Sequence, residues 1–530
     1  MTEVLKDSSN NSPLVFDTTL RDGAQMPGIN LSPDDKVAIA VQLSEIGVDV
    51  IEAGFPSSSE QNFEATQAIA ETVDGPVICA FSGTGEGDVE LAWAAVEAAK
   101  HRGGARLNPC LPVSDLHMSK RLGMTPDQVL DRAVTSVKRA KSFTDDVEFS
   151  AEDASRADPE FLRWIVLAVA DAGATTIMIP DTVGKALPNE YAGLTQRVRG
   201  DLNRRGFGNV AIAAHCHNDM GLAIANTLAA LTDGGASQMD VTAGGIGERA
   251  GNASLEQIAA IAHERLELDI LTRIDTKKLT HLVRDIAQRG GIHLQYHLPV
   301  VGRNAFRHTS GWHQHGITKD RRTFEHMRAQ DYGQIPGQFL ISDQSGRAGI
   351  KNQLEAMAIS ADPEHLLELR KRVEDLTKQE GRFVADGDLE ELNAELTGEP
   401  LIDEFQLDLD QLTESTVRGV STMTVFVNGV EATVSSGKGP VDAAKLAINI
   451  ATGLEGNIEH WDADAPQPDS GSTVGVFATV HLDGHEVDVY AHERSSDFAS
   501  IAAYVKGINM IRRIQSRVGH ITGQQVVDRV

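Results

Sequence analysis

Short apolar stretches alternate with amphipathic stretches through the first half of the chain. The apolar runs are rich in Val, Ile and Ala, and the segments between them place apolar residues at helical spacing. Strands are expected at Val15–Thr19, Val50–Gly54, Val77–Ser82, Ala105–Pro109, Asp146–Ser150, Thr175–Pro180, Val210–His215 and Gln238–Ala243. Eight βα units in about 250 residues are typical of a (β/α)8 TIM barrel. A doubly wound parallel sheet is the alternative.

Local start signals support the helices between these strands. Ser32 and Pro33 offer a cap and a first-turn proline, and Thr125 with Gln128 forms the pattern of a capping box. In a barrel the working residues lie at the carboxyl ends of the strands. Polar residues at those ends are therefore the first candidates for function.

The pattern changes after the eighth unit. The pattern predicts helices without alternating strands in residues 271–404 and a small α+β domain in residues 405–530. Within that domain strands are expected at Thr416–Val427, Val474–Leu482 and Glu486–Ala491, and helices near Asp442–Thr452 and Ala499–Arg512. The predicted organisation is a disordered tail (1–12), a TIM barrel (13–270), helical linker subdomains (271–404) and a C-terminal domain (405–530).

Composition narrows the class of protein. Lys plus Arg total 48 against 76 for Asp plus Glu, a net charge of -28, which argues against nucleic acid as a partner. The chain has no apolar run long enough to span a bilayer, so no membrane partner is expected. Its three cysteines give no disulfide framework, and its polar N-terminus lacks a signal-peptide core. A soluble cytoplasmic protein is predicted.

A candidate metal site lies at three of the strand ends. His215 and His217 are two residues apart at the end of a strand, so both imidazoles can face one point. Asp22, beside Arg21 after the first strand, can add an oxygen ligand, and Asn252 in the glycine-rich stretch after the last strand can add a carbonyl oxygen. The alternative is a purely structural role, in which the histidines are core residues and the glycines shape a turn.

Several motifs carry a family resemblance that spans nearly the whole chain. In the barrel they are FDTTLRDG, IEAGFP, DDVEFSAEDA, IPDTVG, HCHNDMGLAIAN and GGIGERAGN, and later VGRNAFRHTSGWHQHG, SGRAGIK and SGKGPVDAA. Together they resemble the α-isopropylmalate and homocitrate synthase family of metal-dependent, acyl-CoA-condensing TIM barrels, and most closely its 2-isopropylmalate synthases.

The resemblance implies an acyltransferase of leucine biosynthesis. In the family a divalent metal holds a 2-oxo acid, acetyl-CoA loses a methyl proton and attacks the keto carbon, and the thioester is hydrolysed. The implied ion is Mn²⁺ or Mg²⁺, with Zn²⁺ as an alternative and K⁺ as a candidate activator. Acetyl-CoA is the implied co-substrate and 2-oxoisovalerate the implied 2-oxo acid.

The resemblance also implies roles for particular residues. The implied catalytic residues are Arg21, Glu152 and His313, the last reaching the barrel of the partner in a homodimer. The implied substrate-binding residues are Arg21, Gln25, Asn108, Ser150 and Thr182. The implied metal ligands are Asp22, His215, His217 and Asn252. The C-terminal domain resembles the regulatory domain that binds leucine as an allosteric inhibitor.

Some positions depart from the family pattern. Ala24 and Met26 flank Gln25 where relatives carry glutamate and serine, and Asn108 stands where they carry histidine. Trp312, His315 and Phe324 also differ. Changes near Asn108 can reshape the 2-oxo acid pocket, where one methylene is worth about 1–3 kcal/mol. The stretch Glu493–Asp497 lacks the usual glycines, which leaves leucine feedback open.

Three alternative functions are considered for the sequence. The same chemistry on another 2-oxo acid would make the chain a citramalate or homocitrate synthase. A 3-hydroxyacyl-CoA lyase typically carries a cysteine in the loop after the last strand, and Gly244–Asn252 contains none. A non-catalytic dimer that senses a small molecule is the third alternative, and the intact set Arg21, Asp22, His215, His217 and Asn252 argues against it.

Overall fold

The chain divides into two compact units. A computed structural model describes residues 12–268, 270, 273–334, 339–463 and 473–527. One unit comprises residues 1–305 and 327–336, and the other comprises residues 306–326 and 337–530. The predicted disordered tail, residues 1–12, lies outside the described residues except for Ser12. The domain boundaries expected at 270/271 and 404/405 stay predictions.

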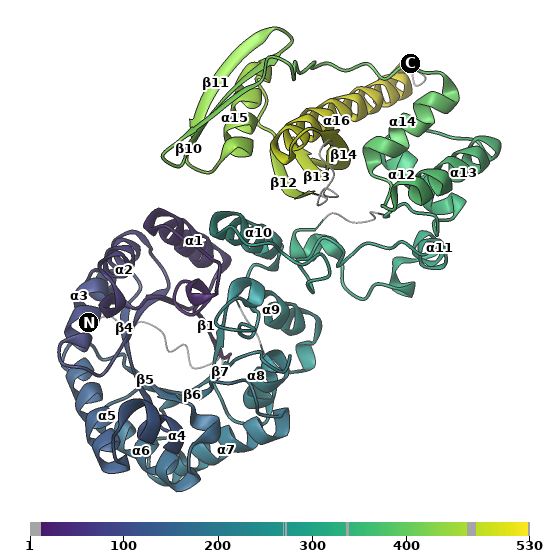
Figure 1. Cartoon of the computed structure of the whole chain (residues 1–530). Helices are drawn as coiled ribbons and strands as arrows, with labels where there is room; N and C mark the ends of the chain where they lie inside the picture. The colour runs from purple at the N-terminus through teal and green to yellow at the C-terminus, as the bar shows by residue number, and fades with distance from the viewer. Residues whose placement is uncertain (1–11, 269, 271–272, 335–338, 464–472, 528–530) are drawn as a thin grey trace. The chain divides into compact units, whose positions relative to one another are not determined.

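The first unit is a closed barrel of eight parallel strands, as predicted (Figure 1). Its strands are β1 (Leu14–Asp17), β2 (Val50–Gly54), β3 (Val77–Ser82), β4 (Ala105–Pro112), β5 (Glu148–Glu152), β6 (Thr176–Asp181), β7 (Ala211–Cys216) and β8 (Gln238–Val241). Strand β1 pairs with both β2 and β8. This closure excludes the doubly wound sheet, which is open.

Helices surround the strands in Figure 1. They are α1 (Pro33–Ile46), α2 (Glu60–Thr72), α3 (Asp88–Val96), α5 (Pro126–Lys141), α6 (Pro159–Ala172), α7 (Pro188–Arg204), α8 (Ala223–Thr232) and α9 (Leu255–Glu264). A short additional helix, α4 (Asp115–His117), follows β4. The capping boxes expected at Ser32 and Thr125 both form, with proline in each first turn.

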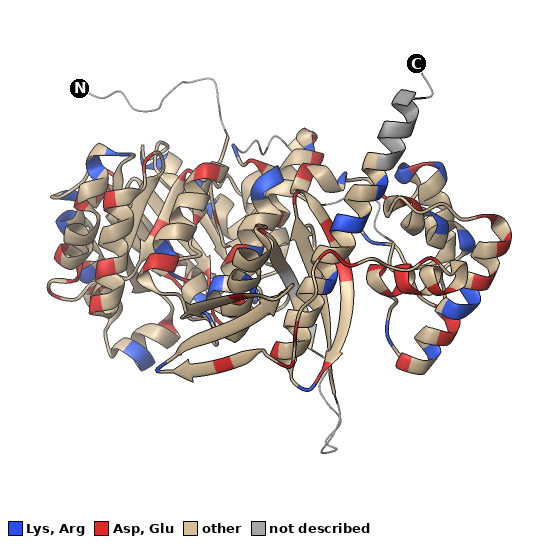
Figure 2. Cartoon of the chain, turned by 90° about the horizontal axis from the view of Figure 1, so that it is seen from above, with Lys and Arg blue, Asp and Glu red and all other residues tan. Residues whose placement is uncertain are grey.

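The region predicted as helical linkers contains five α-helices among its described residues. They are α10 (Leu279–Gly290), α11 (Gly311–Lys319), α12 (Arg347–Ala356), α13 (Pro363–Glu380) and α14 (Asp386–Thr397). Helix α10 belongs to the first unit and the other four to the second. Figure 2 shows acidic and basic residues interspersed along the helices of this region, which is the pattern of solvated faces.

The C-terminal region has two antiparallel three-stranded sheets. One contains β9 (Thr413–Val417), β10 (Val420–Val427) and β11 (Val430–Ser436), and the other contains β12 (Asn457–Ala463), β13 (Val474–Leu482) and β14 (His485–Glu493). Helix α15 (Pro440–Thr452) packs on β10 and β11, and α16 (Ser496–Val527) packs on β13 and β14. The α+β prediction is thereby confirmed.

One strand expectation in this region was wrong. Thr416–Val427 is not a single strand, because the chain reverses at Arg418 and Gly419 between β9 and β10. Both turn residues have positive φ, at 51° and 80°. A two-residue turn with positive φ at both positions matches the right-handed twist of the strands that it joins. Strands β11 and β12 were not anticipated.

Among the described residues, no helix combines the length and the apolar character needed to cross a membrane.

A half-buried acid in the second unit, Asp386, gives an expected pH dependence of stability. The Asp386 carboxylate accepts hydrogen bonds from the Asp488 backbone N–H and the Gln353 amide, at 2.9 and 2.6 Å. Burial, assisted by the Asp488 carboxylate, raises the pKa of Asp386 from 3.8 to about 7, while Arg307 acts in the opposite direction. The folded chain therefore holds this proton up to a pH near 7, and the unfolded chain releases it near pH 3.8.

We expect this residue to contribute stability that is full below pH 3.8 and lost as the pH rises through 7, by at most about 4 kcal/mol. Asp386→Asn should therefore gain melting temperature relative to wild type between pH 5 and pH 8, measured by calorimetry. Asp375→Asn, at an exposed position on α13, is the control. An Asp386→Asn difference that is the same at both pH values contradicts the expectation.

Candidate functional site

Three of the predicted ligands converge at the carboxyl ends of the barrel strands. Asp22 follows β1, while His215 and His217 lie at the end of β7 and just beyond it. The Asp22 Oδ2 atom lies 3.7 Å from Nε2 of each histidine, and the two Nε2 atoms are 3.4 Å apart. All three side chains are buried and together form a possible site for a metal ion.

The charge states of these residues favour a cation. Burial lowers the pKa of His215 below its ordinary value and that of His217 to about 4, so both imidazoles are neutral at neutral pH. Burial alone would raise the pKa of Asp22, but Arg21 and the two histidines hold it well below its usual range. An ionised carboxylate beside two neutral imidazoles is a donor set suited to a divalent ion.

Asn252 completes the cluster with an unused oxygen. Its Nδ2 donates to Asp22 Oδ1 at 3.0 Å and to the Ile246 carbonyl at 3.2 Å. Its Oδ1 is buried and has no hydrogen-bond partner among the described residues. A buried amide oxygen without a partner is costly, and a bound cation would satisfy it. The residues present therefore fit a divalent ion with oxygen and nitrogen ligands.

The glycine-rich loop allows this close approach. A Cβ atom at Gly247 would lie 2.2 Å from Asn252 Nδ2, and one at Gly251 would lie 1.9 Å from the Gly245 carbonyl oxygen. Gly251 also has φ of +82°, which side-chain-bearing residues rarely adopt. Larger residues at these positions would push Asn252 away from Asp22.

A second group of side chains continues from Asp22 across the barrel mouth. Arg21 Nη1 lies 3.0 Å from Asp22 Oδ2, and Arg21 Nε lies 2.6 Å from Glu52 Oε2. Asn108 Nδ2 donates to Glu52 Oε1 at 3.0 Å, and Ser150 Oγ donates to Asn108 Oδ1 at 2.8 Å. The structure thus joins Arg21, Asn108 and Ser150, three of the predicted site residues, through Glu52.

Glu52 was not predicted as a site residue. It is fully buried on β2, and it also accepts a hydrogen bond from Thr18 Oγ1 at 2.6 Å. A usable signal was present in the sequence, because a glutamate inside the apolar run VIEAG is buried only when it is paired. Its position explains how the guanidinium of Arg21 is held in one orientation.

Glu152, Thr182 and Gln25 lie around this centre with different partners. Glu152, the last residue of β5, forms an ion pair with Arg121 and lies 3.6 Å from Nδ1 of His117. Thr182 Oγ1 accepts a hydrogen bond from the Asp153 backbone N–H at 2.9 Å. Gln25 is exposed on the turn after Asp22, and among the described residues no hydrogen bond or ion pair joins its side chain to the centre.

His313 lies in the second unit, on α11. Its imidazole is exposed and stacks on the ring of Phe324, with ring centroids 4.0 Å apart and planes 19° apart. The neighbouring Trp312 is 80% exposed. This segment of α11 therefore presents large aromatic side chains to its surroundings.

An acid lies behind one of the candidate ligands. Nδ1 of His215 is 3.4 Å from Oδ2 of Asp240 on β8. In metal sites an imidazole that ligates through one nitrogen commonly donates from the other to a carboxylate, which fixes its ring and tautomer. Asp240 is placed to act in this way and was not predicted from the sequence.

Family models and curated relatives match the chain over nearly its whole length. The matching models are HMGL-like over residues 12–286, homocitrate synthase post-HMGL domain-like over residues 300–381, and LeuA allosteric (dimerisation) domain over residues 383–512. The 2-isopropylmalate synthase of Acidimicrobium ferrooxidans is 38% identical, over 96% of this chain and 97% of its own. That of Heliobacterium modesticaldum is 40% identical, over 94% and 96%.

Proposed function

We propose that this chain, which belongs to the 2-isopropylmalate synthase family, condenses acetyl-CoA with 2-oxoisovalerate and hydrolyses the resulting thioester. The products are 2-isopropylmalate and CoA, and the reaction is the first committed step of leucine biosynthesis. The observation that carries the proposal is the convergence of Asp22, His215 and His217 beside the anchored guanidinium of Arg21. The proposed location is the cytoplasm.

The reaction needs a polarised keto group, a base and a group that stabilises the alkoxide. Asp22, His215, His217 and Asn252 would hold a divalent ion, which would supply Lewis-acid polarisation of the keto group. The mixed oxygen and nitrogen donors suit Mn²⁺ or Mg²⁺, with Zn²⁺ as the alternative ion and K⁺ as a candidate activator.

Arg21 is proposed to stabilise the alkoxide that forms on the keto oxygen. Its guanidinium is held by Glu52 on one side and Asp22 on the other, at 2.6 and 3.0 Å. A cation fixed before the reaction stabilises developing negative charge without reorganisation. Asn108, Ser150, Thr182 and Gln25 are proposed to contact the 2-oxo acid.

We propose His313 for removal of a proton from the acetyl methyl group, and we propose that Glu152 polarises the substrate or relays the proton. The proton leaves the methyl carbon, the new carbon–carbon bond forms at the keto carbon, and the keto oxygen becomes the alkoxide that is then protonated. Water finally replaces the thiol at the thioester carbon and releases CoA. We propose that His313 of one subunit serves the barrel of the other in a homodimer, consistent with its exposure on α11.

Asn108 bears on the choice of 2-oxo acid. Its amide bridges Glu52 and Ser150 at 3.0 and 2.8 Å, so the side chain is oriented by both neighbours. The same chemistry on pyruvate or 2-oxoglutarate would make the chain a citramalate or homocitrate synthase. Comparing CoA release with these acids and with 2-oxoisovalerate tests the substrate assignment.

Feedback by leucine is proposed for the C-terminal region, which matches the LeuA allosteric domain. The unusual stretch Glu493–Asp497 runs from the last residue of β14 into the first turn of α16, and Ser495 Oγ accepts a hydrogen bond from the Phe498 N–H at 3.3 Å. We expect millimolar leucine to inhibit CoA release, with glycine at the same concentration as the control. Activity unchanged across the leucine titration would exclude feedback.

A further inference from the structure

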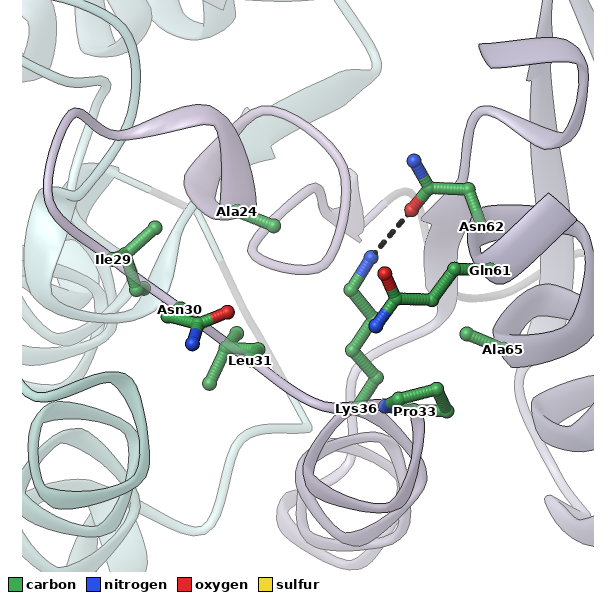
Figure 3. A pocket seen from close by; sticks show the side chains of 9 residues that line it. All are labelled: Ala24, Ile29, Asn30, Leu31, Pro33, Lys36, Gln61, Asn62 and Ala65. Carbon is green, nitrogen blue, oxygen red and sulfur yellow. Dashed lines mark hydrogen bonds between the residues drawn. The ribbon is translucent and has the colours of Figure 1, made fainter. Parts of the chain in front are cut away.

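A small cavity lies between the amino-terminal ends of α1 and α2 (Figure 3). Its volume is about 150 Å³, several times the roughly 30 Å³ that a water molecule occupies in the liquid. The wall is formed by the β1–α1 connection, including Ala24 and Asn30, by Pro33 and Lys36 of α1, and by Gln61 and Asn62 of α2. The cavity belongs entirely to the first unit.

Among the described residues that line the cavity, Lys36 carries the only charged side chain. The residue is 8% exposed, and its ammonium donates to Asn62 Oδ1 at 2.7 Å (Figure 3). No ion pair with a carboxylate is formed by Lys36 within the described part of the chain, and burial lowers its pKa. A buried ammonium paired only with a neutral amide is poorly compensated, so an anion in the cavity would be favourable.

The other polar groups in the wall agree with an anionic ligand. Asn30, Gln61 and Asn62 bring amide groups that can donate hydrogen bonds. The first turns of α1 and α2, whose partial positive charge also favours anions, border the cavity. The acids in those turns, Asp34, Asp35 and Glu60, are not among the lining residues.

The cavity lies at the same end of the barrel as the candidate active site. Ala24 in its wall is only two residues beyond Asp22, so their Cα atoms are at most about 7.6 Å apart. The segments that border it follow the carboxyl ends of β1 and β2, as the active-site residues Arg21 and Asp22 do. The cavity wall therefore lies within the length of one extended ligand from the candidate metal site.

We propose that this cavity binds a phosphate group of the CoA thioester, with the Lys36 ammonium as its principal partner. The proposal rests on the proposed function, because acetyl-CoA is the phosphate-bearing substrate of that reaction. The cavity volume of about 150 Å³ accommodates a single phosphate group. Lys36 is a binding residue here and takes no part in bond making.

Binding of CoA and of pantetheine, which lacks all CoA phosphates, tests the proposal by isothermal titration calorimetry on the full chain. We expect wild type to bind CoA more tightly than pantetheine, and Lys36→Met to reduce that ratio roughly tenfold, since a charge-assisted hydrogen bond is lost. Lys36→Arg should keep most of the ratio. Lys138→Met, at an exposed position on α5, should leave it unchanged.

An unchanged CoA-to-pantetheine ratio in Lys36→Met overturns the proposal. Inorganic phosphate is titrated alone and in competition with CoA, and phosphate that binds through Lys36 without competing with CoA overturns the assignment to CoA. These measurements need no turnover, so failure of the proposed reaction is seen separately as an absence of CoA release with every 2-oxo acid.

Discussion

Replacing His215 or His217 by alanine is expected to lower CoA release at least roughly 1,000-fold, because Lewis-acid assistance is worth several kcal/mol. Each imidazole nitrogen lies 3.7 Å from Asp22 Oδ2, so each substitution removes one nitrogen donor from the same centre. The measurement is the initial rate of thiol release from acetyl-CoA at saturating Mn²⁺. Mn²⁺ affinity, measured separately by calorimetry, should fall in parallel.

The matched control is His101→Ala, at an exposed histidine on the outside of the barrel. It should keep both the rate and the Mn²⁺ affinity of wild type. Removing metal from wild type with EDTA should mimic the His215 variant, and adding Mn²⁺ should restore wild type alone. A His215→Ala or His217→Ala variant that folds and turns over at the wild-type rate contradicts the proposed metal site.

Replacing His313 by alanine is expected to lower the rate constant for turnover about 100- to 10,000-fold, the range for loss of a general acid or base. Mn²⁺ affinity should be unchanged, because His313 is not among the proposed metal ligands. The two classes of variant therefore separate proton transfer from metal binding. A variant with normal turnover would remove His313 from the catalytic residues.

Mixing two inactive variants tests whether His313 acts across subunits. A heterodimer of His215→Ala and His313→Ala carries both lesions at one site and neither at the other. If subunits exchange randomly in an equal mixture, half of the dimers are mixed and each has one intact site, so about a quarter of wild-type activity should return. No recovery after verified exchange would mean that His313 serves the barrel of its own chain.

The barrel could be predicted from the sequence because its signals are local and repeated. Each buried strand is a short apolar run, and the helices carry their own caps, as Ser32 and Thr125 illustrate. The convergence of His215 and His217 followed from the two-residue period of a strand. The prediction that Asp22 lies beside these two histidines depended on assuming a closed barrel.

The missed features depend on pairing between segments far apart in the chain. Glu52 is important because Arg21, Thr18 and Asn108 all meet it, and none of these contacts is local in sequence. Asp240 behind His215 is a similar case. The break between β9 and β10 was missed because Val417-Arg418-Gly419-Val420 has the composition of a continuing strand, and only the left-handed backbone of two residues reveals the turn.

The most direct test of the proposed function is CoA release from acetyl-CoA with Mg²⁺ or Mn²⁺ present. The panel contains 2-oxoisovalerate, pyruvate, 2-oxobutyrate and 2-oxoglutarate, with an EDTA control for each. The proposal predicts metal-dependent release that is fastest with 2-oxoisovalerate. A different preferred acid would contradict the substrate assignment while keeping the chemistry, and no release with any acid would contradict the proposed function itself.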